Sequence, residues 1–64
     1  MIDVNQRLIR IASAAREGDN DAATGGERDL FVDVLKAVAN GEAGSAEAKQ
    51  ALMSLELVFP RWTA

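Results

Sequence analysis

The sequence predicts an all-α protein, a small three-helix bundle with a short C-terminal tail. Apolar residues recur at helical spacing in three groups, and turn-forming residues separate these groups. The chain has 64 residues, which leaves room for one small domain. We therefore expect a single helical domain over residues 1–64.

The first helix is expected at about residues 4–17. Asp3 suits the N-cap position, because its carboxylate can accept a hydrogen bond from a free amide of the first turn, and Gln6 follows at capping-box spacing. Gly18 follows the last apolar residue and suits the position just after the helix. One face carries Val4, Leu8, Ile11 and Ala15.

The second helix is expected from Glu27 to Ala39. The segment Gly18–Gly26 before it is rich in Gly, Asp and Asn and is predicted to be a loop, with Thr24 and Glu27 spaced as a capping box. Asn40-Gly41 predicts the end of the helix. Its apolar face is broad, as in a central helix contacted on two sides, and consists of Leu30, Phe31, Val34, Leu35 and Val38.

The third helix is expected from Ser45, as N-cap, to Phe59, with Pro60 ending it because the residue before a proline avoids the helical conformation. A short strand over residues 54–59 is the alternative, since apolar residues also alternate there. The inner face of the helix is predicted to comprise Ala48, Leu52, Leu55 and Phe59.

Acidic residues are concentrated in the middle of the chain. The net charge is −3, and residues 17–33 hold six acids against Arg28 as the single base. These acids either stabilise a helix N-terminus and keep the protein soluble, or form a negative surface that binds a positive one. Arg7 and Arg10 are expected to pair with the acidic loop, and Lys36 to relieve Asp33.

The candidate partner-binding residues follow from this charge distribution and from the single tryptophan. Trp62 either covers the end of the bundle or is an exposed anchor, since tryptophan is enriched in binding hot spots. The candidates are Glu17, Asp19, Asp21, Asp29, Asp33 and Trp62.

Several function classes are disfavoured by composition. The chain lacks Cys and His, which removes disulfides, zinc-finger sites, thiol nucleophiles and the commonest general base. Asp19-Asn20-Asp21 fits no register of a calcium loop, and Gly25-Gly26 is not followed by the Lys-Ser/Thr of a phosphate loop. We therefore predict no enzymatic activity, no cofactor and no metal site.

Binding to DNA and insertion into a membrane are also disfavoured. In a helix-turn-helix interpretation the recognition helix would carry Lys49 as its only base, the wrong balance for phosphate contacts, so a DNA-binding regulator is a third, less favoured hypothesis. No apolar run reaches the roughly 18 residues of a membrane span, and the first residues lack the apolar core of a signal peptide. The chain is expected to be soluble and cytoplasmic.

Protein–protein interaction remains. The favoured hypothesis is a small acidic inhibitor that docks on a basic, nucleic-acid-binding surface of a larger protein or nucleoprotein complex, and so acts as a nucleic-acid mimic. The alternative is a homo-oligomeric structural or assembly subunit, such as a homodimer. Its interface would use the broad face of the second helix and the cluster Leu57, Val58, Phe59 and Trp62.

In size, acidity and lack of catalytic motifs, the whole chain resembles the small phage-encoded inhibitors of bacterial defence, the anti-CRISPR proteins in particular. The resemblance is one of type, without a shared motif, and it assigns no functional residue. It implies a phage or mobile-element origin, a Cas complex as the target, and the cytoplasm of a bacterial host as the location.

Overall fold

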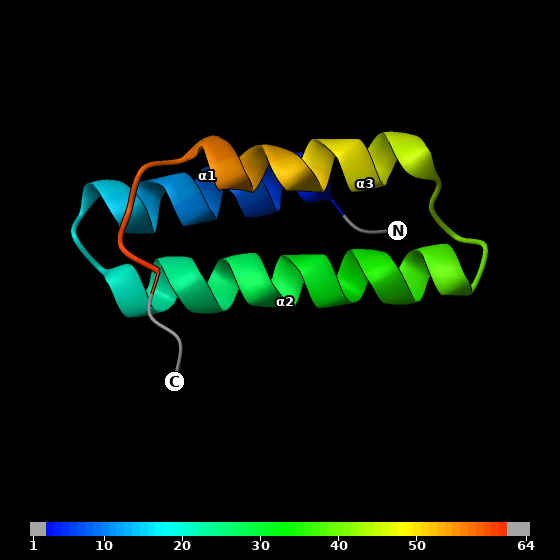
Figure 1. Ribbon diagram of the computed structural model, residues 1–64, viewed down its shortest axis with the longest axis horizontal. Coiled ribbons are helices and arrows are strands. Elements are labelled where there is room, and N and C mark those ends of the chain that lie inside the picture. The colour runs from blue at the N-terminus through cyan, green and yellow to red at the C-terminus, as the bar shows by residue number, and fades with distance from the viewer. Residues whose placement is uncertain (1–2, 62–64) are drawn as a thin grey trace.

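The computed structural model describes residues 3–61 and contains three helices packed together (Figure 1). Helix α1 spans Val4–Arg16, α2 spans Asn20–Ala39 and α3 spans Ser45–Leu52, and a 3₁₀ turn, η1, continues α3 over Met53–Glu56. Helices α1 and α3 lie side by side and run along the longer α2, and each helix contacts the other two. The predicted all-α class and bundle architecture are confirmed. No strand occurs in residues 3–61, so the alternative of a short strand near the C-terminus is wrong.

Helix α1 begins and ends as the sequence predicts. The Asp3 side chain accepts a hydrogen bond from the backbone amide of Gln6 at 3.0 Å, which confirms it as the N-cap. Gly18 has φ +78°, and its amide bonds to the carbonyl of Ala15, while the amide of Asp19 bonds to that of Ala14. These two bonds form a Schellman motif, in which glycine supplies the left-handed residue that ends the helix.

The predicted loop over Gly18–Gly26 is wrong, because α2 starts at Asn20. Asp19 is its N-cap, and its side chain accepts from the amide of Ala22 at 3.2 Å. The residue that closes the α1 Schellman motif therefore also opens α2, and the connection between the helices is a tight turn. The predicted capping box of Thr24 and Glu27 is also wrong, since both residues lie inside α2.

Gly25 and Gly26 lie inside α2, although glycine disfavours a helix interior by about 1 kcal/mol relative to alanine. Gly26 has a packing reason. A β-carbon there would lie 3.2 Å from Cγ1 of Ile11, so the glycine allows α1 and α2 to approach closely. Nothing lies within 4 Å of a β-carbon built on Gly25. The cost of Gly26 in helix propensity is thus offset by close packing against a buried residue of α1.

The helix predicted to run to Phe59 is shorter than expected. Regular α-helix ends at Leu52, and after η1 the chain becomes extended at Leu57, with φ −73° and ψ +136°. Gly44, not Ser45, is the N-cap of α3, and its amide donates to the Glu47 carboxylate at 2.6 Å. Residues 57–61 return as a strap across the end of the bundle where α1 meets α2 (Figure 1). The predicted stop at Pro60 thus falls outside any helix.

The hydrophobic core is small and lies where the three helices and the strap meet. Its fully buried large apolar side chains are Ile11 on α1 and Leu30 on α2. The remaining buried apolar residues are Val4, Ala23, Val34, Ala51 and Phe59. The prediction that Leu35, Leu52 and Leu55 are core residues is wrong, because their exposed fractions are 69%, 53% and 54%. The third helix packs against α2 through alanines, so it leaves Leu35 uncovered, and its own Leu52 and the following Leu55 face away from the core.

Candidate functional site

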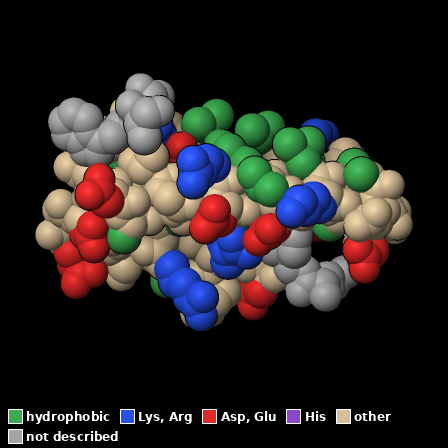
Figure 2. Space-filling model, turned by 90° about the horizontal axis from the view of Figure 1, so that it is seen from below, with side chains coloured by type: hydrophobic (Ala, Val, Ile, Leu, Met, Phe, Trp, Pro, Cys, Tyr) green, Lys and Arg blue, Asp and Glu red, His purple; other side chains and the backbone are tan. Residues whose placement is uncertain are grey.

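An apolar groove runs between α2 and α3 on one broad face of the molecule. It has a volume of about 360 Å³ and almost purely apolar walls. We define the α2–α3 groove by its lining residues, Phe31, Val34, Leu35, Val38, Ala48, Ala51 and Leu52. Figure 2 shows apolar side chains gathered along one edge of the α2 face.

The groove arises from the residue pattern of both helices. Val34 and Ala51 form its buried floor, whereas Leu35 and Leu52 stand on its two rims and are more than half exposed. Leu55 follows Leu52 by three positions, which extends the α3 rim into η1 on the same side. Because alanines at positions 48 and 51 let α3 approach α2 without filling the space, the larger side chains remain open to solvent.

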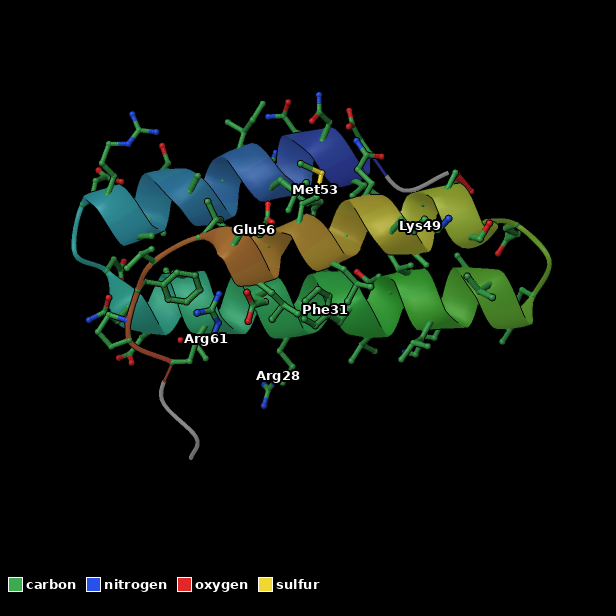
Figure 3. All side chains as sticks on the ribbon, turned by 45° about the horizontal axis from the view of Figure 1, so that its top comes forward. Arg28, Phe31, Lys49, Met53, Glu56 and Arg61 are labelled. Carbon is green, nitrogen blue, oxygen red and sulfur yellow. The ribbon has the colours of Figure 1, made fainter. Side chains whose placement is uncertain are left out.

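Two oppositely charged residues lie beside one end of this groove, just beyond its lining residues Phe31 and Leu52. Arg28 projects from the outer side of α2, and Glu56 lies on η1 at about the same level along the bundle, with Phe31 between the two elements (Figure 3). Both charged residues are exposed. Within residues 3–61 neither Arg28 nor Glu56 forms an ion pair, and the ion pairs there join Arg7 to Asp33 and Arg61 to Glu27.

The predicted acidic residues separate into two places. Glu17, Asp19 and Asp21 lie together at the α1–α2 turn, where all three are exposed, and Asp19 also caps α2. We call these three the acidic turn. Figure 2 shows acidic side chains gathered at one end of the molecule. Trp62 lies outside the described residues.

Asp29 and Asp33 lie on α2, away from the acidic turn. Asp33 is paired with Arg7 of α1 at 3.0 Å, so its charge is neutralised within the chain. The expected pairing of Arg7 with the acidic loop is wrong, because its partner Asp33 lies on α2, outside the segment Gly18–Gly26. The partner of Asp33 is Arg7 rather than the expected Lys36. Asp29 is exposed and follows directly on Arg28.

A buried polar network, which the residue pattern does not predict, holds the strap against α2. Glu27 is only 7% exposed and accepts hydrogen bonds from Nε and Nη2 of Arg61, at 2.9 and 3.0 Å. The hydroxyl of Ser54, which is fully buried, donates to Glu27 at 2.5 Å. Arg61 also donates to the carbonyls of Ser54 and Leu57 at 3.0 and 3.1 Å, and its guanidinium lies 4.1 Å from the centre of the Phe59 ring.

This network keeps Glu27 ionised. Hydrogen bonds from the Arg61 side chain and from Ser54, together with the positive charge of Arg61, hold the pKa of Glu27 below its ordinary value, although burial acts in the opposite direction. Both carboxylate oxygens are occupied, and the Ser54 hydroxyl donates to a carboxylate rather than facing a substrate. Glu27, Ser54 and Arg61 are therefore arranged to hold the fold together, and Glu27 lies inside α2 rather than in the first turn of a helix.

In residues 3–61, acidic side chains do not gather in a group of three that could hold a metal ion. None of the helices described is both long enough and apolar enough to span a bilayer.

Comparisons with protein-family models, with curated proteins and with solved structures find no match to this chain. Its surfaces and their chemistry are therefore the basis for proposing a function.

Proposed function

We propose that this protein is a non-enzymatic interaction module that binds another protein chain through the α2–α3 groove. The observation that carries the proposal is the exposure of the side chains on the rims of the groove. The exposed fractions of Leu35 and Leu52 are 69% and 53%. Contiguous apolar surface on a small protein promotes non-specific association unless a partner covers it. A groove between two helices is also the shape that receives a helix or a pair of helical ridges from a partner.

The energetics assign different roles to the groove and to the charges around it. Burying an exposed leucine completely contributes about 1.5–3 kcal/mol, so covering each half-exposed rim leucine contributes roughly half of that. Exposed ion pairs contribute about 0–1 kcal/mol each and are weakened by salt. The rim leucines are therefore expected to supply most of the binding free energy, and the flanking charges to set the orientation of the partner.

A second candidate function is the small acidic inhibitor predicted from the sequence. What supports it is the acidic turn, where Glu17, Asp19 and Asp21 are exposed at one end of the molecule. In this proposal the turn docks on the basic, nucleic-acid-binding surface of a larger protein or nucleoprotein complex, such as a Cas complex. The ion pair of Asp33 with Arg7 favours the groove over this candidate, because it removes Asp33 from the predicted acidic surface.

Capture experiments with three variants separate the two candidates. Tagged wild type, Leu35→Arg, Asp21→Lys and, as a matched control outside the groove, Ile9→Arg are used to capture binding proteins from source-cell lysate at low and high salt. Ile9 suits the control because it is also a large apolar residue, 57% exposed, and lies on α1. Circular dichroism verifies that each variant is folded.

If the groove is the contact surface, Leu35→Arg alone loses the captured protein or the second copy, and raised salt has little effect. Loss with Asp21→Lys and with raised salt, but not with Leu35→Arg, would replace the groove with the acidic inhibitor. Equal capture by all four proteins would refute both candidates.

A further inference from the structure

We infer that the partner in the α2–α3 groove is a second copy of this chain, packed face to face so that α2 of each copy lies over α3 of the other. The inference rests on the proposed function of the groove and names its occupant. In this homodimer the twofold axis runs along the groove, and the helices α2 of the two copies point in the same direction.

The shape of the face supports pairing with itself. The same face presents two apolar ridges, one through Leu35 on α2 and one through Leu52 on α3, with the groove between them. Rotation by half a turn about the groove direction places the α2 ridge of one copy opposite the α3 ridge of the other. Each ridge then meets apolar surface along its length, as the packing of helical ridges into grooves requires.

The extent of the face fits what an interface needs. The Cα positions span 35 × 23 × 16 Å, and the groove lies between α2 and α3, which run along the longest dimension (Figure 1). A stable interface of standard size buries about 800 Å² on each partner, which is the scale of this face. A chain of 64 residues also has a small core of its own, so covering the rim leucines adds stability that the monomer lacks.

The charges beside the groove select the direction of pairing. Arg28 and Glu56 lie on opposite sides of the groove at about the same level along the bundle (Figure 3). Rotation about the groove direction exchanges the two sides and keeps the level, so Arg28 of one copy meets Glu56 of the other, and this happens twice per dimer. A rotation axis across the groove would instead reverse the level and leave both charges unmatched. Charge complementarity therefore favours the parallel arrangement.

The test is a charge-reversal cycle measured by sedimentation equilibrium at low salt. Arg28→Glu and Glu56→Arg each place like charges opposite one another at two symmetric positions, and each should raise the dimer dissociation constant by about tenfold. The double variant restores both pairs with reversed sign and should return to within about threefold of wild type. Arg10→Glu is the matched control: it makes the same change of charge at an exposed residue of α1 outside the groove, and should leave dimerisation nearly unchanged.

The outcomes separate this inference from the proposed function. A dimer that the double variant restores supports the parallel homodimer. The parallel pairing would be overturned if Arg10→Glu raised the dimer dissociation constant as much as the other reversals do. It would also be overturned if no charge reversal changed that constant. A wild type that stays monomeric at the highest soluble concentration would overturn the second copy as occupant. In that last case the groove proposal still stands if Leu35→Arg abolishes capture of a different protein.

Discussion

Arg61 and Glu27 are joined by two hydrogen bonds, 2.9 Å from Nε to Oε1 and 3.0 Å from Nη2 to Oε2, across 34 positions of the chain. This contact holds the strap, residues 57–61, against α2 and places Phe59 in the core. Ser54 completes it from η1, so one carboxylate connects three elements. Regular α-helix ends at Leu52, and this network anchors the chain that follows it.

Removing the charge of Glu27 should destabilise the fold. Glu27→Gln keeps the size of the side chain but weakens the hydrogen bonds from Arg61 and Ser54. Because hydrogen bonds to charged groups contribute about 1.5–3 kcal/mol, we expect the free energy of unfolding to fall by about 2 kcal/mol. Urea denaturation followed by circular dichroism measures the change. Glu42→Gln, at an exposed residue, is the control, and an equal effect of the two substitutions would contradict the role of the network.

The same network predicts a loss of stability in acid. The pKa of Glu27 in the folded protein lies below its ordinary value of 4.5, so the carboxylate contributes stability above that pH. This contribution is lost as the pH falls through the lowered pKa of the folded protein. The difference in unfolding free energy between wild type and Glu27→Gln should therefore be largest at neutral pH and shrink below about pH 4.5. A difference that stays constant from pH 7 to pH 3 would contradict this.

The two glycines inside α2 should respond differently to alanine. Gly25→Ala meets open space and should stabilise the protein by about 1 kcal/mol, through helix propensity alone. Gly26→Ala places a β-carbon 3.2 Å from Ile11 Cγ1, so the neighbouring core side chain must shift. We expect Gly26→Ala to stabilise the protein less than Gly25→Ala does, or to destabilise it. Thermal unfolding of the two variants measures the difference. Equal gains would mean that α1 and α2 pack less closely than described.

Gly18→Ala should destabilise the α1–α2 turn. Gly18 has φ +78°, in the left-handed region, which costs a residue with a β-carbon roughly 1 kcal/mol. Nothing lies within 4 Å of a β-carbon built there, so backbone strain is the only expected cause. Chemical denaturation should show a loss of about 1 kcal/mol. Gly18→Asn, which tolerates this conformation better, should lose less, and a larger loss for asparagine would contradict the explanation.

The sequence predicts the fold class and the limits of α1 well, because periodicity and capping are local. It fails at the start of α2. Gly25 and Gly26 resemble a loop by composition, whereas the fold uses Gly26 for close contact with Ile11, and Asp19 is a better cap than Thr24. Such packing between two helices leaves no signal in the spacing of residues along one of them.

The candidate site was predicted only in part. Helical spacing places Phe31 and Leu35 on one apolar face, but it does not say how much of that face α3 covers. The pairing of Asp33 with Arg7, and that of Glu27 with Arg61, join residues far apart in the sequence, and several cations could have taken either place. The six proposed partner-binding residues, Trp62 among them, therefore stay predictions.

The most direct test of the central claim, that the α2–α3 groove is the contact surface, is the effect of Leu35→Arg on complex formation compared with that of Ile9→Arg. Both replace an exposed apolar residue by the same cation, at 69% and 57% exposure. Sedimentation velocity of the purified chains, and capture from source-cell lysate, report complexes with a second copy and with other proteins. We expect Leu35→Arg to stay folded and to lose the complex, while Ile9→Arg keeps it. A folded Leu35→Arg variant that still forms every complex of the wild type would contradict it.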